Sequence, residues 1–252
     1  MSLLKVEQVS RRFGSLVAVD QVSMTVEPGE FRAVIGPNGA GKTTFFNLIS
    51  GFLLPTSGRI LFDDQDVTAV KPANRVKLGM ARTFQVTEIF PELSVRENLR
   101  IPVEVAAGHR LKPWQSRADA RAMDERVDEL LQRSGLTGKA GRLAGELSHG
   151  DQRATEIMMA IALNPRLLLL DEPTAGMGDQ ETYDVTQLIR KLHREQKLTV
   201  VLIEHDMRVV FHLADRVMVL AEGQLLAEGT PDEIAADDAV QEAYLGAEAE
   251  TA

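Results

Sequence analysis

The sequence contains no cysteine, and this absence excludes several kinds of chemistry at once. Among its 252 residues there is no thiol that could form a disulfide, attack a substrate or bind a metal as thiolate. Nothing in the composition asks for an oxidising compartment. We therefore expect a protein of the cytoplasm.

Long hydrophobic runs are also missing. No uninterrupted apolar stretch approaches the ~20 residues that a membrane-spanning helix needs, and residues 1–13 lack the basic segment and apolar run of a targeting peptide. We expect the chain neither to enter nor to cross a membrane alone. A net charge of −9 gives little long-range attraction for nucleic acid, so no nucleic-acid partner is expected.

What the sequence does have is the composition of an ordinary globular protein, with 44% apolar and 26% charged residues. Residues 1–30 alternate apolar and polar positions between turn signals, which predicts half-buried antiparallel strands. Residues 31–35 predict a short buried strand. A glycine-rich turn follows, and then a helix is expected over 42–49, with Gly51 ending it.

The middle of the chain has a helical pattern, from about residue 88 to 150. Ser94 is expected to begin one helix, and a longer one is predicted from about 117 to 133 because apolar residues recur there at helical spacing. Between them, residues 106–115 contain glycine and proline and predict a surface connection. This stretch is therefore interpreted as a helical lobe.

The second half of the chain alternates buried strands with helices. Apolar runs at 167–172 and 198–205 are separated by a helix expected over 180–194, and another helix is expected to end at Ala214. This order predicts a parallel sheet covered on both faces. A hairpin is expected around 222–223, and the acidic, alanine-rich end of the chain is expected to be a solvated terminus.

The segment GPNGAGKT, residues 36–43, fits the phosphate-binding loop pattern and lies between a predicted strand and a predicted helix. Its glycines let backbone N–H groups turn toward a phosphate, and the helix N-terminus adds a favourable dipole. Lys42 is expected to reach the β- and γ-phosphates, and Thr43 to offer its hydroxyl to Mg²⁺. The expected ligands are ATP and Mg²⁺, and the nucleotide-binding residues are Asn38, Gly39, Ala40, Gly41, Lys42, Thr43 and Thr44.

Residues 167–172, LLLLDE, predict the second half of a nucleotide site. A buried strand would deliver Asp171 to Mg²⁺ through water and would place Glu172 where it can polarise an attacking water. A carboxylate pair at a strand end can also be simply where the strand meets solvent. Together with the phosphate loop, the pair indicates an NTPase, a class that includes transporters and kinases.

The segment LSHGD, residues 147–151, resembles the signature LSGGQ of ABC transporter ATPases. The resemblance implies a helix over 152–163. It also implies that Ser148 and Gly150 contact the γ-phosphate of ATP held by an opposite subunit, so that ATP joins a head-to-tail dimer.

The chain departs from the family pattern in two places. In the signature, His149 replaces the first glycine and Asp151 replaces the glutamine. Where the family often has Ser-Ala-Leu-Asp after the Glu-Pro-Thr turn, this chain has other residues at 175–178, with Asp179 one place later. Communication between two ATP sites through that segment is therefore left open.

The same resemblance implies roles for three more residues. Gln85, which ends ARTFQ, matches the glutamine that contacts Mg²⁺ and links the catalytic core to the helical lobe, and His205 matches the switch histidine at the γ-phosphate. Phe13 takes the place of the aromatic residue that stacks on adenine. Each could instead be an ordinary surface or packing residue. The implied catalytic set is Lys42, Gln85, Glu172 and His205, and the implied metal set is Thr43, Gln85 and Asp171.

The resemblance covers residues 4–246 and implies an α/β fold: a P-loop NTPase of the ABC cassette type. Such a cassette has a RecA-like parallel-sheet core, an N-terminal antiparallel β subdomain and an inserted helical subdomain. We expect the core with its β subdomain at 1–86 and 156–225, the helical subdomain with the signature at 87–155, and a C-terminal tail at 226–252.

The sequences of the motifs, including IFPELSVRENL and LLLLDEPTAGM, are similar to those of the ATPases of branched-chain amino acid importers. This implies an ATPase on the cytoplasmic face of the inner membrane, driving uptake of branched-chain or related amino acids. The implied partners are a second ABC ATPase, integral membrane permease subunits and, indirectly, a periplasmic solute-binding protein. ARTFQ resembles the first of two paired ATPases, which favours a heterodimer over a homodimer.

Several alternatives remain at this point. Importers of short amides, urea or aromatic acids share the same motifs. The ATPase of a lipopolysaccharide exporter has a similar size and layout, and soluble ABC ATPases without a transport role also exist. In the family, a permease helix docks beside the segment 86–99, where Phe90, Pro91 and Leu93 are expected either to form the docking surface or to pack inside the lobe.

Overall fold

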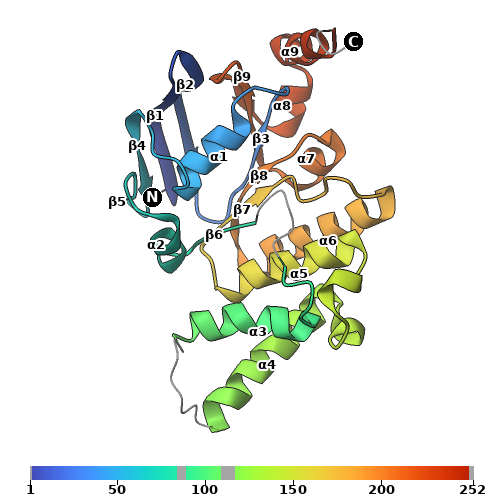
Figure 1. Cartoon of the computed structure of the whole chain (residues 1–252). Coiled ribbons are helices and arrows are strands. Elements are labelled where there is room, and N and C mark those ends of the chain that lie inside the picture. The colour runs from blue at the N-terminus through green and yellow to red at the C-terminus, as the bar shows by residue number, and fades with distance from the viewer. Residues whose placement is uncertain (1, 84–88, 109–116, 250–252) are drawn as a thin grey trace.

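The computed structural model describes residues 2–83, 89–108 and 117–249 of the chain. Two β-sheets lie beside one another, and a lobe of helices extends away from them (Figure 1). The arrangement confirms the expected α/β architecture of antiparallel sheet, parallel sheet and helical lobe.

The smaller sheet is antiparallel, with its strands in the order β2-β1-β4-β5. The strands are β1 (Leu4–Phe13), β2 (Leu16–Val26), β4 (Ser57–Phe62) and β5 (Gln65–Asp66). Val22, Met24 and Val26 alternate into the core along β2, as the period-two pattern predicts. The expectation of antiparallel strands in the first thirty residues is confirmed.

The larger sheet has the strand order β10-β9-β3-β8-β7-β6. The strands are β3 (Phe31–Ile35), β6 (Met80–Arg82), β7 (Leu167–Asp171), β8 (Thr199–Ile203), β9 (Arg216–Ala221) and β10 (Gln224–Gly229). All neighbours are parallel except β10, which forms the expected hairpin with β9. Every residue of β3, β7 and β8 is buried, which confirms a parallel sheet covered on both faces.

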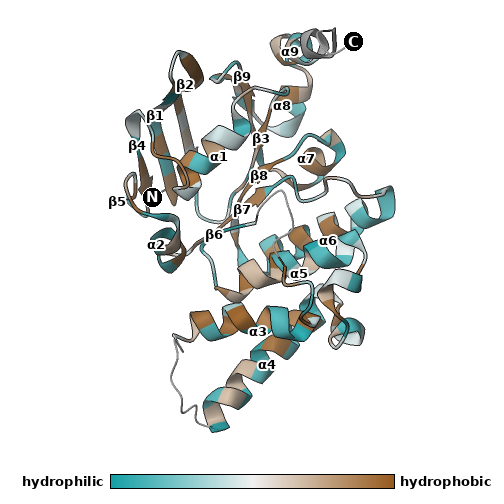
Figure 2. Cartoon of the chain, in the orientation of Figure 1, coloured by the Kyte–Doolittle hydropathy of each residue, from teal (hydrophilic) through white to brown (hydrophobic). Residues whose placement is uncertain are grey.

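The helices predicted from the sequence are present, and residues 72–77 form one that was not predicted. Those on the sheets are α1 (Lys42–Ser50), α2 (Pro72–Lys77), α6 (Asp179–Gln196) and α7 (Met207–Leu213). In the described residues the lobe contains α3 (Val95–Ala106), α4 (Arg117–Ser134) and the 3₁₀ turns η1 (Thr137–Lys139) and η2 (Ala144–Glu146). Helix α5 (His149–Ala162) follows these turns. Ser94 begins α3 with a capping box, in which its side chain and that of Glu97 each accept a hydrogen bond from the other's backbone N–H. Figure 2 shows hydrophobic residues along α3 and along the strands of the sheets.

Two other regions of the chain also differ from the expectations. Helix α5 begins at residue 149 rather than 152, so the segment LSHGD itself supplies the N-cap and first turn. The end of the chain is not simply a solvated terminus, because it forms α8 (Pro231–Ala235) and α9 (Asp238–Ala249). Ile234 and Val240 belong to a buried cluster with Ile35 and Val210, so these helices cover part of one face of the larger sheet.

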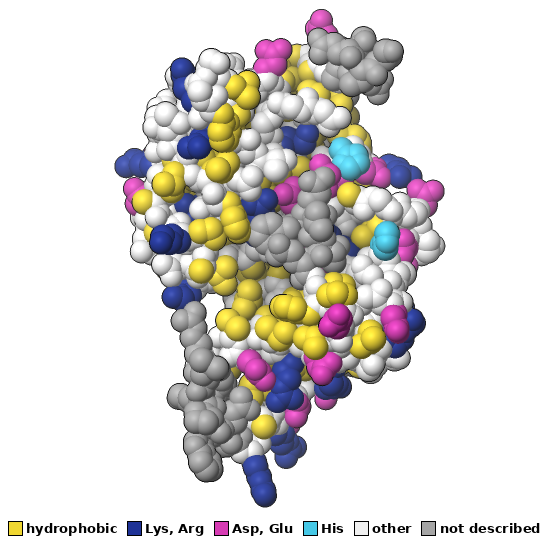
Figure 3. All heavy atoms as spheres, in the orientation of Figure 1, with side chains coloured by type: hydrophobic (Ala, Val, Ile, Leu, Met, Phe, Trp, Pro, Cys, Tyr) yellow, Lys and Arg dark blue, Asp and Glu magenta, His cyan; other side chains and the backbone are white. Residues whose placement is uncertain are grey.

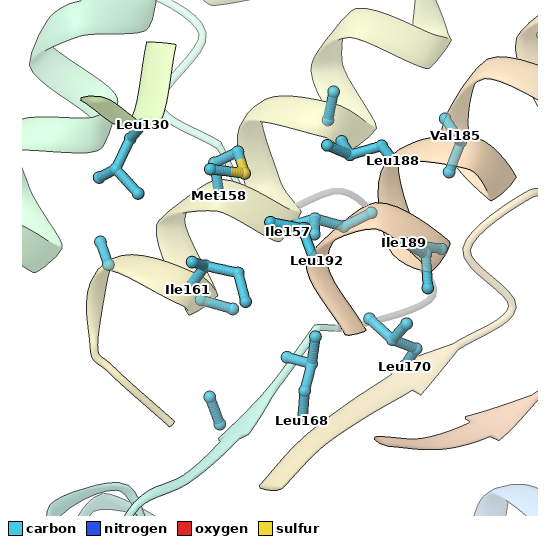
Figure 4. Packing of buried hydrophobic residues seen from close by; sticks show 14 of the residues in the cluster. Leu130, Ile157, Met158, Ile161, Leu168, Leu170, Val185, Leu188, Ile189 and Leu192 are labelled. Carbon is cyan, nitrogen blue, oxygen red and sulfur yellow. The ribbon is translucent and has the colours of Figure 1, made fainter. Parts of the chain in front are cut away.

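Helix α5 lies between the lobe and the larger sheet and belongs to the core of both. Figure 4 shows Ile157, Met158 and Ile161 of α5 among side chains from the lobe, from β7 and from α6. The buried cluster that contains them runs without a break from Val95 in the lobe to Leu202 in the sheet. The lobe is therefore joined to the sheet by packed side chains as well as by the chain itself. No helix among the described residues is both long and apolar enough to cross a bilayer.

Candidate functional site

The predicted phosphate loop connects β3 to α1 and passes very close to two other backbone segments. A Cβ atom added to Gly36 would lie 2.0 Å from the carbonyl oxygen of Leu220, and one added to Gly41 would lie 2.3 Å from that of Ala18. Gly41 also has a φ of 93°, which a residue with a side chain rarely adopts. Glycine is thus required at both positions by space and, at 41, by backbone conformation.

Lys42 is the first residue of α1, and its ammonium group folds back over the loop. The Nζ atom donates hydrogen bonds to the carbonyl oxygens of Gly36 at 2.8 Å and Pro37 at 2.9 Å. Burial lowers the pKa of Lys42, while the negative charges of Glu172 and Asp171 oppose that shift. The expected phosphate-binding ammonium therefore lies near Glu172, predicted to be catalytic, and near Asp171, predicted to bind the metal.

A cleft of about 520 Å³ opens beside the loop. This volume is within the range that small-molecule sites occupy. The lining residues are Leu16, Val17, Ala18, Asn38, Gly39, Ala40, Gly41, Lys42, Thr43, Thr44, Glu172, Glu222 and Gly223. All of the loop residues predicted to bind nucleotide are included, together with Glu172.

Phe13, the expected adenine-stacking residue, is not part of this lining. It pairs across the hairpin with Leu16, which does line the cleft, and 43% of it is exposed. The guanidinium carbon of Arg11 lies 4.6 Å from the centre of its ring. Phe13 is therefore at the rim, with a cation already near its ring.

Asp171 ends β7 and is buried, with an ion pair that no sequence pattern predicted. Arg82 Nη2 donates to Asp171 Oδ2 at 2.9 Å, while Arg82 Nη1 donates to Asn47 Oδ1 at 2.7 Å and Ser50 Oγ at 2.6 Å. Arg82 thus ties the carboxylate to helix α1, which follows the phosphate loop. A carboxylate has about four acceptor sites, so this bond does not exhaust those of Asp171.

Glu172 has an unusual backbone conformation, with a φ of 43°. Such a conformation costs a residue with a side chain roughly 1–2 kcal/mol and persists only where the surroundings enforce it. The Glu172 N–H donates to the carbonyl oxygen of Ile203 at 3.0 Å. We call residues 171–174, which contain the predicted catalytic residue Glu172, the catalytic turn.

His205 follows β8 and lies beside Glu172, with 4.0 Å between His205 Nδ1 and Glu172 Oε1. Its side chain is 61% exposed, so it is not a packing residue of the core. The structure thus gathers Lys42, Asp171, Glu172 and His205 at the carboxyl ends of three neighbouring parallel strands, the usual position of ligands in open α/β sheets.

Glu204 is a buried carboxylate next to His205 that was not among the predicted site residues. It accepts hydrogen bonds from the backbone N–H groups of Thr174 at 3.2 Å and His205 at 2.9 Å, and from the hydroxyl of Thr174. One carboxylate therefore holds the catalytic turn and the His205 segment together. Its position beside a motif residue was the only available signal.

Ser148 and Gly150 do not line the cleft beside the phosphate loop, which we call the phosphate cleft. Ser148 is the N-cap of α5, where its hydroxyl accepts a hydrogen bond from the N–H of Asp151 at 3.3 Å. The N–H of Gly150 donates to Glu181 Oε1 at 3.2 Å. This bond, with those from Ser148 and Gly178, lowers the pKa of Glu181, which sequence reasoning also missed.

Gln85, predicted for both the catalytic and the metal set, lies outside the described residues. Among the residues that the structure does describe, no group of three or more His, Asp or Glu side chains could hold a metal ion. Thr43 and Asp171 supply hydroxyl and carboxylate oxygens, the ligand type that Mg²⁺ prefers when it binds together with phosphates and water. The residues present are therefore compatible with nucleotide-bound Mg²⁺.

Comparisons with known proteins indicate the same kind of protein over nearly the whole chain. The family described as "ABC transporter" matches residues 19–175, and the one described as "Branched-chain amino acid ATP-binding cassette transporter" matches residues 224–250. The high-affinity branched-chain amino acid transport ATP-binding protein LivG of Escherichia coli (strain K12) is 40% identical, over 97% of this chain and 98% of LivG.

Solved structures give the same result. A nucleotide-free ATP-binding cassette from an ABC transporter matches with a TM-score of 0.83 and 31% identity, over 96% of this chain and 98% of that one. An ATP-binding cassette in its ADP conformation matches with a TM-score of 0.85 and 30% identity, over 98% and 99% of the two chains.

Proposed function

The chain belongs to the ABC transporter family of ATP-binding cassettes, and from this premise we propose that it powers the uptake of branched-chain or closely related amino acids. As a member of this family it binds nucleotide and is an ATPase. The observation that carries the import proposal is the 40% identity to LivG over nearly the full length of both chains. The match of residues 224–250 to a branched-chain amino acid description supports it from a separate part of the sequence.

The phosphate loop is proposed to hold the phosphates of ATP. Its backbone N–H groups would surround the β-phosphate, and Lys42 would exchange its bonds to the loop carbonyls for bonds to the β- and γ-phosphates. Thr43 and Asp171 would hold Mg²⁺, together with Gln85. The metal ion would neutralise part of the negative charge of the phosphates.

Glu172 and His205 are proposed to carry out the hydrolytic step. Glu172 lines the phosphate cleft and would polarise the attacking water, while His205 would contact the γ-phosphate. The distance of 4.0 Å between them is short enough for both to act on the same water and phosphate. The strained backbone at Glu172 supports a functional role, because such strain is concentrated at active sites.

The partner of the site is proposed to be a second ABC ATPase, arranged head to tail. Ser148 and Gly150 lie away from the phosphate cleft of their own chain, which supports their contact with ATP held by the other subunit. The helix N-terminus at Ser148 suits a phosphate group. A heterodimer is proposed, because ARTFQ resembles the first of two paired ATPases.

The permease is proposed to dock on the lobe near Phe90. Phe90 is 48% exposed and Pro91 is exposed, whereas Leu93 is half-buried and has a smaller share in the surface. On the face seen in Figure 3, hydrophobic side chains gather where the lobe meets the sheets. Exposed apolar surface of this kind suits a docking helix.

The test is transport-coupled hydrolysis by a complex rebuilt in vesicles. The chain would be purified with the second ATPase and the permeases encoded beside it, and ATP hydrolysis would be measured with the amino-acid-loaded binding protein added. We expect the loaded binding protein to stimulate ATP hydrolysis and to cause solute to accumulate inside the vesicles. A complex that carries Glu172→Gln should show neither the stimulated hydrolysis nor the accumulation. Hydrolysis that does not respond to the binding protein but responds to lipopolysaccharide would instead support an exporter.

A further inference from the structure

The guanidinium group of Arg153 connects the signature helix to the catalytic turn. Arg153 lies on α5 and is 2% exposed. Its Nη2 atom donates to the carbonyl oxygens of Asp171 at 2.7 Å and Glu172 at 3.0 Å, and its Nε atom donates to that of Pro173 at 3.1 Å. One side chain therefore binds three consecutive carbonyl groups around the proposed hydrolytic residue.

Glu156, one turn further along α5, holds this guanidinium in place. Arg153 Nη1 donates to Glu156 Oε2 at 2.6 Å, and both side chains are buried. A buried charge pair of this kind is rigid because breaking it leaves an uncompensated charge. The pair thus fixes the donors of Arg153 relative to the axis of α5.

The catalytic turn is held from two sides. From β8, the carbonyl oxygen of Ile203 accepts the N–H of Glu172, and Glu204, the residue after β8, binds Thr174. From α5, Arg153 binds the three carbonyls. Because Glu172 has a strained backbone, its conformation depends on such contacts, and the direction of its carboxylate follows from that conformation.

The helix that carries Arg153 also carries the signature residues. Ser148 and Gly150 are at the N-terminus of α5, and the helix packs against α3 and α4 of the lobe. Any displacement of α5 by the partner's nucleotide or by the lobe therefore moves Arg153 relative to β8.

We propose that Arg153 is a positioning residue, through which α5 sets the backbone of the catalytic turn and so aims the Glu172 carboxylate of the same subunit. The proposal rests on the proposed function of Glu172. In this arrangement, the helix that meets the partner's ATP also adjusts hydrolysis of its own subunit's ATP.

Only arginine has the geometry for this role. Its planar guanidinium carries five N–H donors in a fixed fork, so it reaches three carbonyls and a carboxylate together. A lysine ammonium has three donors at a single point and cannot reproduce the fork. Arg153→Lys therefore keeps the charge and removes the geometry.

The experiment compares Arg153→Lys with Arg75→Lys in the full-length chain. Arg75 is an equally buried guanidinium that also binds backbone carbonyls, including those of Leu48 and Val67, but none in the catalytic turn. Arg153→Lys should lower kcat by about ten- to a hundredfold, as small misplacements of catalytic groups do. It should leave KM for ATP close to wild type. Arg75→Lys should lower the melting temperature with kcat retained.

A double substitution tests whether Arg153 acts through Glu172. In a Glu172→Gln background, measured over long single turnovers, Arg153→Lys should cause no further loss, because the group that it aims is gone. The proposal would be overturned if Arg153→Lys lowered the rate of hydrolysis by the same factor in both backgrounds. It would also be overturned if Arg153→Lys and Arg75→Lys had equal kcat values. Wild-type turnover in Glu172→Gln alone would instead refute the proposed role of Glu172.

Glu156→Gln keeps the proposal testable if Arg153→Lys does not fold. It leaves the guanidinium in the protein but weakens its anchor, so kcat should fall with KM for ATP unchanged. A Glu156→Gln protein that melts earlier but hydrolyses ATP at the wild-type rate would also contradict the proposal.

Discussion

The phosphate loop and the catalytic turn meet at the same cleft, yet they are built differently. The loop is one continuous segment, residues 36–43, whose shape depends on its own glycines. The catalytic turn depends on residues far away in the sequence: Arg153 of α5, Ile203 and Glu204 at the end of β8. The loop is therefore determined within one motif, whereas the catalytic turn is sensitive to movements elsewhere in the protein.

Breaking the turn while sparing the loop should produce the largest effect. Glu172→Gln removes the group that polarises water, so turnover should fall by roughly two to four decades. ATP binding should persist, because the loop is untouched, and the ATP-bound dimer should accumulate. Turnover and nucleotide affinity, measured on the same preparation, distinguish the contribution of the turn from that of the loop. Wild-type turnover in Glu172→Gln would refute the role assigned to Glu172.

His205→Ala should have the next largest effect, of about a hundredfold on turnover, if the side chain contacts the γ-phosphate. Because 61% of the side chain is exposed, its loss should change the melting temperature little. Turnover and thermal unfolding are the measurements. Preserved activity with a large loss of stability would show that the histidine has a structural role after all.

Breaking the loop should weaken binding itself. Lys42→Ala removes a charge-assisted contact of about 2–3 kcal/mol, so the dissociation constant for ATP should rise roughly 30- to 150-fold. Lys77→Ala, at an exposed lysine of α2, is the matched control and should leave the constant unchanged. Calorimetric titration measures both, and equal affinities in the two variants would refute the phosphate-binding role of Lys42.

A smaller effect is expected at the N-terminus of α5, away from both regions. The pKa of Glu181 is lowered by its hydrogen bonds, so its contribution to stability is present above its ordinary pKa of 4.5 and is lost as the pH falls through its lower folded value. Glu181→Gln should thus melt slightly below wild type at pH 7, and the difference should shrink in acid. A difference independent of pH would exclude this ionic contribution.

Phe90→Glu should have the least effect on the isolated subunit, because Phe90 belongs to neither region. Hydrolysis by the purified subunit should be unchanged, but assembly with the permease and stimulation by solute should be lost. Phe211→Glu places the same charge at a phenylalanine of α7 that is 44% exposed, and it should assemble normally. Normal transport with Phe90→Glu would exclude a docking role for this position.

The difference between the loop and the catalytic turn also explains which features could be predicted from the sequence. The loop, the alternating strands and the carboxylates at the end of β7 are local patterns, and each can be predicted from neighbouring residues alone. Arg82 and Arg153 were missed because their partners lie 89 and about 18–20 residues away, and no periodicity marks such contacts.

The differences at α5 and at the end of the chain have separate causes. Helix α5 begins earlier than expected because Ser148 caps it, whereas the apolar spacing that suggested a helix starts only at residue 152. Helix α8 had a readable signal: Thr230 and Glu233 form a capping box with Pro231 at the first position. Burial of Ile234 in that acidic segment could not be predicted, because it depends on the neighbouring sheet.

The continuous packing around α5 has a consequence for how the protein unfolds. The expected boundary between residues 155 and 156 falls inside this helix, and Ile157 and Ile161 pack in the cluster that spans lobe and sheet. Separating the two parts would expose those side chains to water, at a cost of about 1.5–3 kcal/mol for each one fully exposed. We therefore expect a single cooperative unfolding transition, with amide protons of α5 exchanging as slowly as those of β7. A peptide of the lobe alone, cut at residue 155, should remain unfolded.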